Sequence, residues 1–223
     1  MRSDLAFRTP SLSPARASNV RQFMAGACAL VGLGAIGAAF WEVDLKYSTP
    51  TPRPASLAEV EPGAQLELPA DLERFLRSAP GPTLLHFFNP QCPCSRFNLE
   101  HVIELARRFE GRARVLAVLA EGEEAADAVE ALSEHFPARV DSGGRLAEAL
   151  GVYSTPQAAI VGPDLRLYWR GNYNRTRYCV EPNSEYARIA LEAALAGRSA
   201  PQFDSRATLA YGCELPGAED DAR

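Results

Sequence analysis

The sequence predicts an α/β domain with a central mixed sheet flanked by helices, preceded by one N-terminal helix that can cross a membrane. Three observations support this prediction. Short apolar runs alternate with helical patterns, a strand–turn–strand pattern follows them, and an uncharged stretch of about 20 residues lies near the N-terminus. A chain of 223 residues can bury one sizeable core, so we expect a single folded domain after the N-terminal helix.

The pattern of strands and helices begins near residue 69. Strands that alternate with helices predict a largely parallel sheet with both faces covered, and the turn GPD between two apolar runs predicts an antiparallel hairpin. The expected elements are helices at 69–79, 95–111, 123–136, 144–151 and 183–197, strands at 82–88, 113–120 and 138–142, and a hairpin over 157–171.

The uncharged stretch at residues 22–41 predicts a transmembrane anchor. The segment before it, residues 1–21, carries four arginines and one aspartate, so the positive-inside rule keeps that segment in the cytoplasm. A cleaved signal peptide is the alternative, because the small residues Gly37 and Ala39 offer a cleavage site. Cys28 lies inside the stretch and is interpreted as a small packing residue.

Three further segments complete the expected organisation. Residues 42–65 are rich in proline and predict a semi-extended linker, residues 66–213 form the domain, and residues 214–223 form an acidic tail. The net charge of -5 provides no basic stripe for phosphates, so we expect no nucleic-acid partner. If the anchor directs the domain out of the cytoplasm, its cysteines face an oxidising compartment in which disulfides persist.

The segment NPQCPCSRFN, at residues 89–98, contains the candidate site. Cys92 follows a predicted strand and begins a predicted helix, where unpaired backbone N–H groups stabilise a thiolate and lower a thiol pKa. Prolines before and after it stiffen the turn, so we expect the sulfur to point outward. Cys94 lies two residues further on, and a Cys92–Cys94 disulfide requires a bend at Pro93. Two reduced thiols without chemistry are the alternative.

Two stretches resemble a known family. LLHFFNPQCPCSRF, at residues 84–97, resembles the active-site strand and turn of thioredoxin. GGRLAEALGVYSTPQAAIVGPDLRLYWRGNY, at residues 143–173, is similar to the latter half of membrane-anchored, periplasmic thioredoxin-like proteins. The signature CPCSRFN also resembles a little-characterised bacterial family of single-span, CPCS-type thioredoxin-like proteins. The resemblance covers residues 66–197 and implies a thioredoxin-like fold at the bacterial inner membrane, with the C-terminal domain in the periplasm.

The resemblance implies roles for individual residues around the turn. Cys92 matches the nucleophile of the family's C-x-x-C motif, Ser95 falls on the place of its second cysteine, and Cys94 is additional. Pro156 matches the family's cis-proline, and Thr155 before it is expected to face the substrate.

His86 matches the position of a buried proton-transfer group in many thioredoxins. It is expected either to transfer protons, to stabilise the thiolate as a cation, or to be a hydrogen-bonded core histidine. His101 and His135 are expected to face solvent.

The resemblance also implies that the segment RGNYNRTRYC, at residues 170–179, lies near the cysteine turn. Arg175 and Arg177 are candidates for holding a thiolate or a substrate carboxylate, with a plain surface role as the alternative. Cys179 and Cys213 are the candidates for a structural disulfide, and Cys179 is alternatively the thiol that resolves Cys92.

These residues predict a membrane-anchored thiol–disulfide oxidoreductase that acts on protein disulfides through Cys92, with Cys94 or Cys179 resolving. We expect no cofactor and no metal, and partners that are protein thiols or disulfides together with a membrane or periplasmic redox protein. A thioredoxin-like chaperone for Cu(I) or another metal, and a non-catalytic adaptor, are the alternatives.

Overall fold

The computed structural model describes residues 14–122, 124–175 and 184–215 and divides the chain into two units, Met1–Ser48 and Thr49–Arg223. The first unit consists of helix α1, Pro14–Ser48. Within it, Asn19–Glu42 has a mean hydropathy of 2.0 and is long and apolar enough to cross a membrane. Its large apolar side chains, such as Phe23 and Phe40, are exposed.

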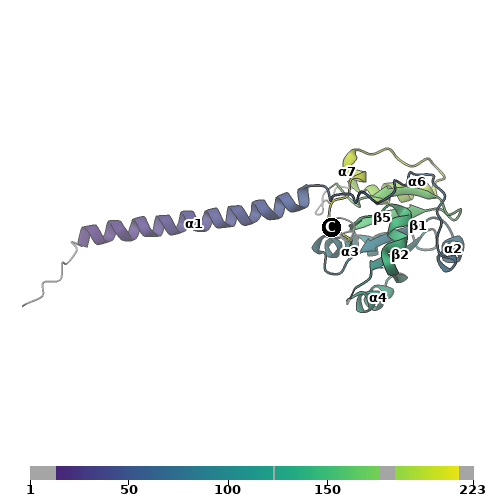
Figure 1. The fold of residues 1–223 in the computed structure, drawn as a ribbon, viewed down its shortest axis with the longest axis horizontal. Helices are drawn as coiled ribbons and strands as arrows, with labels where there is room; N and C mark the ends of the chain where they lie inside the picture. The colour runs from purple at the N-terminus through teal and green to yellow at the C-terminus, as the bar shows by residue number, and fades with distance from the viewer. Residues whose placement is uncertain (1–13, 123, 176–183, 216–223) are drawn as a thin grey trace, which may run out of the picture. The chain divides into compact units, whose positions relative to one another are not determined.

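The second unit is built on a five-stranded mixed sheet with the strand order β3-β2-β1-β5-β6 (Figure 1). Strands β1, β2 and β3 are parallel, whereas β5 pairs antiparallel with β1 and with β6. The strands are β1 Thr83–Phe88, β2 Arg114–Ala120, β3 Ala138–Asp141, β4 Ser154–Thr155, β5 Gln157–Val161, β6 Leu167–Gly171 and β7 Cys213–Glu214. The predicted parallel strands and the antiparallel hairpin are therefore confirmed.

Helices cover both faces of the sheet, as predicted. They are α2 Ala70–Arg77, α3 Pro93–Arg108, α4 Ala125–Ser133, α5 Arg145–Leu150, α6 Tyr186–Leu195 and α7 Ser205–Thr208, with a short 3-10 turn η1 at Ser142–Gly144. Strand β1 is buried along its whole length and contributes alternate side chains to two apolar clusters. One cluster contains residues of α3 and α6, and the other contains residues of α2 and α5.

The segment before α2 packs on the domain, in contrast to the predicted linker at 42–65. Thr51 is buried, and its backbone N–H donates to Ala210 O at 2.8 Å. Gly63 N donates to Leu167 O at 2.6 Å, and Gln65 forms an antiparallel bridge with Arg166. The backbone of β6 and of the C-terminal segment thus gives this stretch hydrogen-bond partners, and the compact unit begins at Thr49 and not at residue 66.

Candidate active site

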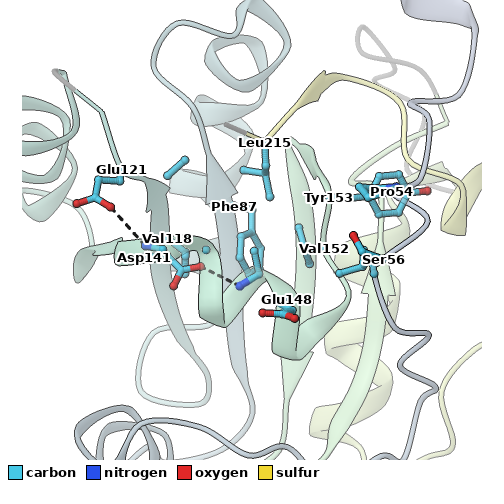
Figure 2. A pocket seen from close by; sticks show the side chains of 15 residues that line it. Pro54, Ser56, Phe87, Val118, Glu121, Asp141, Glu148, Val152, Tyr153 and Leu215 are labelled. Carbon is cyan, nitrogen blue, oxygen red and sulfur yellow. Dashed lines mark hydrogen bonds between the residues drawn. The ribbon is translucent and has the colours of Figure 1, made fainter. Parts of the chain in front are cut away.

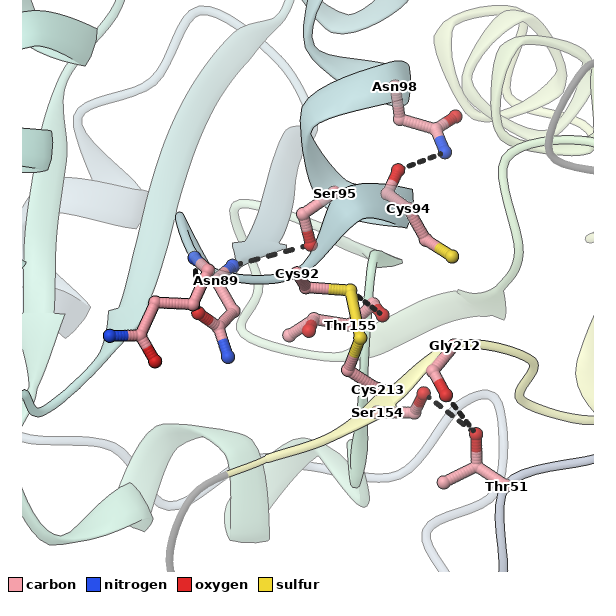
Figure 3. Close-up of a disulfide and its surroundings, with 11 residues drawn as sticks. Thr51, Asn89, Cys92, Cys94, Ser95, Asn98, Ser154, Thr155, Gly212 and Cys213 are labelled. Carbon is pink, nitrogen blue, oxygen red and sulfur yellow. Dashed lines mark hydrogen bonds between the residues drawn. A yellow bond between two sulfur atoms is a disulfide. The ribbon is translucent and has the colours of Figure 1, made fainter. Parts of the chain in front are cut away.

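A tight turn connects β1 to α3 and presents Cys92 at the start of the helix (Figure 3). Asn89 O accepts from Cys92 N at 3.0 Å, and the Asn89 side chain accepts from Gln91 N at 2.9 Å. Asparagine at the first position of a turn and proline at the second favour this geometry. Cys92 is the N-cap of α3 and Pro93 follows it, with no acidic residue in the first helical turn.

Ser95 stabilises the same turn. Its side chain is fully buried, and its hydroxyl oxygen accepts from Asn89 N at 3.4 Å. The position that corresponds to a second cysteine in the resembled motif is therefore occupied by a residue that fixes the turn. A serine has no sulfur, so Ser95 cannot form the disulfide that the second cysteine of that motif forms.

The predicted cis-proline is confirmed, since the Thr155–Pro156 peptide bond is cis. Thr155 lies in the short strand β4 and is fully buried. Its carbonyl oxygen lies 3.5 Å from Cys92 Sγ, so the proline loop is directly beside the sulfur. The Thr155 hydroxyl has no hydrogen-bond partner among the described residues.

Cys92 forms a disulfide with Cys213, with a Cα–Cα distance of 6.1 Å (Figure 3). Strand β7 pairs antiparallel with β4 and places Cys213 opposite Thr155. This pairing corrects the expected Cys179–Cys213 disulfide, and it also differs from the Cys92–Cys94 bond. The cause is the register of β7 on β4, which brings Cys213 to Cys92 across 121 residues of sequence. Cys179 itself lies outside the described residues.

The sulfur of Cys92 does not point outward as predicted. Cys92 is only 2% exposed, whereas its partner Cys213 is half-buried. The disulfide holds Cys213 of β7 against Cys92 at the start of α3. Cys94 is 3% exposed, and its backbone oxygen accepts from the Asn98 side chain at 3.2 Å. Among the described residues, the site therefore contains the Cys92–Cys213 disulfide and, two residues after Cys92, the buried Cys94.

Thr51 connects three segments at this site, which the sequence did not indicate. Its hydroxyl lies 3.1 Å from the Ser154 hydroxyl and donates to Gly212 O at 3.2 Å. Ser154 belongs to β4, and Gly212 immediately precedes the disulfide cysteine. The segment that follows α1 therefore braces both the proline loop and the strand that contains Cys213.

His86 is a core histidine on the central strand. Its Nδ1 lies 2.8 Å from the Tyr173 hydroxyl, and its ring stacks edge-on against Tyr173. Burial, with a smaller contribution from the nearby His101, lowers the pKa of His86 to about 3. A lowered pKa favours the neutral ring at neutral pH, and together with the hydrogen bond to Tyr173 it supports the prediction of a hydrogen-bonded core histidine over that of a thiolate-stabilising cation. Burial also raises the pKa of Tyr173 well above its usual value.

The structure describes His101, His135 and Arg175 among the remaining residues with a predicted position or role. His101 is partly buried, with its ring edge-on to Tyr173, and this burial lowers its pKa, so the prediction of a solvent-facing side chain is wrong. His135 is exposed as predicted. Arg175 forms an ion pair with Asp204 at 3.6 Å, and its role toward a substrate stays a prediction. Arg177 lies outside the described residues.

A cavity of about 560 Å³ lies next to β7 (Figure 2). The side chains of Phe87, Val118, Val152 and Leu215 form its apolar lining. Asp141 lines it as well, and its carboxylate accepts from Leu146 N at 2.9 Å and from Ala147 N at 2.8 Å. Within the part of the chain that the structure describes, no group of three or more potential metal ligands occurs.

Several solved structures are similar to this chain. A hypothetical protein from Sinorhizobium meliloti 1021 has 19% identity and a TM-score of 0.58, and the match covers 71% of this chain and 95% of that one. An uncharacterized conserved protein from Geobacillus kaustophilus has 20% identity and a TM-score of 0.56, covering 72% and 93%. A putative thioredoxin from Neisseria meningitidis has 18% identity and a TM-score of 0.42, covering 52% and 76%.

No curated protein matches the sequence at a significant level. Residues 61–214 match the family described as a domain of unknown function, DUF6436. The strand order, the cysteine at the start of α3 and the cis-proline before β5 make the fold thioredoxin-like. The chain therefore belongs to the DUF6436 family, with a thioredoxin-like domain that follows an N-terminal apolar helix.

Proposed function

We propose that this protein exchanges thiols and disulfides with other proteins through the pair Cys92 and Cys213. One observation supports this proposal most strongly: the Cys92–Cys213 disulfide lies at the N-terminus of α3 and beside cis-Pro156. Unpaired N–H groups at a helix N-terminus stabilise a thiolate, which makes Cys92 both a good nucleophile and a good leaving group. We call the protein whose cysteines are exchanged the client.

The exchange takes place in two steps. The Cys92 thiolate attacks one sulfur of a client disulfide, so a mixed disulfide forms and the first client thiolate leaves. The Cys213 thiolate then attacks Cys92 Sγ, which forms the Cys92–Cys213 disulfide and releases the second client thiolate. Two electrons pass from the pair to the client, and a dithiol of a redox partner protein restores the reduced pair. The reverse sequence oxidises a client dithiol.

A redox titration of the full chain in detergent tests this proposal. We expect the Cys92–Cys213 pair to titrate between about -270 and -120 mV, the range of catalytic disulfides. Mass spectrometry of non-reduced peptides is expected to recover the Cys92–Cys213 crosslink from the oxidised chain. A midpoint below about -300 mV, the range of structural disulfides, would contradict the proposal and favour the non-catalytic adaptor.

We also propose that α1 anchors the domain on the outer side of the inner membrane. The four arginines before the apolar stretch and its mean hydropathy of 2.0 support this orientation. A thiol–disulfide exchange site of this kind is suited to an oxidising compartment.

Alkaline phosphatase fused after residue 223 is expected to be active in intact bacteria, because this enzyme requires an oxidising compartment. The fusion should fractionate with membranes. A matched fusion to a chain lacking residues 1–48 serves as the cytoplasmic control. Activity no higher than that of the control contradicts the orientation, and activity in the soluble fraction favours the cleaved signal peptide.

A further inference from the structure

The C-terminal segment at residues 212–215, here called the docked segment, binds β4 in the manner of an added peptide strand. Strand β7 is antiparallel to β4, with Cys213 opposite Thr155 and Glu214 opposite Ser154. Beyond the strand, Leu215 N donates to Tyr153 O at 3.2 Å. An extended peptide that adds to a sheet edge gains affinity from such main-chain hydrogen bonds and specificity from alternate side chains.

The position before the disulfide cysteine accepts only glycine. A Cβ atom added to Gly212 would lie 2.2 Å from Thr155 O and 2.9 Å from Thr155 C. Both of these atoms belong to the backbone, and β4 cannot move away easily because Cys92 Sγ and Pro156 are next to it. Figure 3 shows Gly212 beside Ser154 and Thr155. The close approach of the two backbones therefore imposes a glycine at this position.

Glu214 and Leu215 differ in burial, as expected for neighbouring residues of an extended strand. Glu214 is exposed, whereas Leu215 is 8% exposed and packs in the apolar cluster that contains Phe87 and Val152. Leu215 also lines the 560 Å³ cavity, so this cavity lies beside the docked segment (Figure 2). The edge of β4 and this cavity are together called the groove. The groove therefore contacts a glycine, a cysteine and, two positions after the cysteine, an apolar side chain.

We propose that the docked segment occupies the site at which a client segment binds, and that it resembles such a segment in sequence. Clients are then extended segments with glycine before the reactive cysteine and an apolar residue two positions after it. This inference rests on the proposed function, because it assigns the client chemistry of the same Cys92 site. In the mixed disulfide, the client strand pairs with Thr155 in place of β7. Attack by Cys213 on Cys92 Sγ then returns β7 to β4 and releases the client as a thiol.

Synthetic peptides test this inference directly. The probe is the peptide AYGCELP, a copy of residues 210–216, with its cysteine carried as a mixed disulfide with thionitrobenzoate. Attack by the Cys92 thiolate on the peptide sulfur forms a Cys92–peptide disulfide and releases coloured thionitrobenzoate. Two substituted peptides, AYACELP and AYGCEDP, remove the glycine and the apolar residue in turn. The Cys92→Ser chain gives the blank for the other cysteines.

The protein variant that reacts with these peptides is here called the host. It is the full chain in detergent with Cys213→Ser and Gly212→Ala, in which the added methyl group prevents β7 from pairing with β4. The matched control host carries Cys213→Ser and Gly122→Ala, because a Cβ at Gly122 meets no atom within 4 Å. We expect AYGCELP to react with Cys92 at least about tenfold faster than either substituted peptide, since burial of a leucine side chain alone exceeds this factor. The Gly212→Ala host should also react about tenfold faster with AYGCELP than the control host.

Two outcomes overturn the inference. If the three peptides react at equal rates while the peptide-free reagent dithiobis-nitrobenzoate still labels Cys92, the groove does not recognise this pattern, although the proposed function stands. If neither the peptides nor that reagent reacts at Cys92, the proposed function fails as well. The same order of peptide rates is measured on the reduced wild-type chain, which contains no substitution and so does not depend on how the variants fold.

Discussion

The Cys92→Ser substitution is expected to lower the rate of thiol–disulfide exchange on the order of 10³-fold or more, the scale of loss when a covalent nucleophile is removed. Cys92 is the cysteine that caps α3 and lies 3.5 Å from the carbonyl oxygen of Thr155. Serine at this position preserves the turn but cannot form a disulfide. The measurement is reduction of insulin by the full chain in detergent, with dithiothreitol as the electron source.

The Cys213→Ser substitution is expected to have a different effect, because it leaves the nucleophile in place. Cys92 can still attack, but the mixed disulfide with insulin lacks its resolving thiol and should accumulate, as detected by mass spectrometry. Cys28→Ser is the matched control, since Cys28 lies in α1 and outside the domain. Accumulation of the mixed disulfide in Cys94→Ser, and not in Cys213→Ser, would assign the resolving role to Cys94.

The sheet and its helices could be predicted because burial produces a periodic pattern. Strand β1 is apolar at every position except Thr83 and His86, and it is buried on both faces as the central strand. The position of Cys92 at the start of a helix followed from the same pattern. The cis peptide bond before Pro156 was predicted from the family resemblance, because the residues alone do not specify it.

The disulfide partner of Cys92 could not be predicted from the sequence. Strand β7 has two residues, too few for a periodic signal, and its register on β4 depends on the close approach of Gly212 to Thr155. The packing of Thr51 could not be predicted for a similar reason. A proline-rich composition indicates an extended chain, and it does not reveal that the backbone finds partners at Ala210 and Leu167. Close backbone contacts between distant segments leave no pattern in the sequence.

The role of His86 was left open by the sequence because its burial, and not its position, determines its charge. An imidazole on the central strand is fully buried, so its protonated form loses hydration without gaining a partner of opposite charge. Its Nε2 atom has no hydrogen-bond partner among the described residues. Protonation of His86 therefore opposes folding, and this effect can be measured.

Acid is expected to destabilise the domain through His86. The folded pKa of about 3 lies below the unfolded value of 6.5, so between these values the unfolded chain binds a proton that the folded chain does not. Stability is therefore complete above pH 6.5 and falls as the pH decreases, with a contribution from this group of about 1.4 kcal/mol per pH unit. Between about pH 7 and pH 5 this amounts to roughly 2 kcal/mol.

The double variant His86→Phe, Tyr173→Phe isolates this contribution. Tyr173 is replaced as well because its buried hydroxyl would otherwise lose the partner that lies 2.8 Å away. Urea unfolding at a series of pH values is expected to show a loss between pH 7 and pH 5 that is smaller by roughly 2 kcal/mol in the double variant. His135→Asn, which changes an exposed histidine, should leave the pH dependence close to that of the wild type. Equal slopes in the wild type and the double variant would contradict the lowered pKa of His86, because the folded domain would then bind this proton as readily as the unfolded chain.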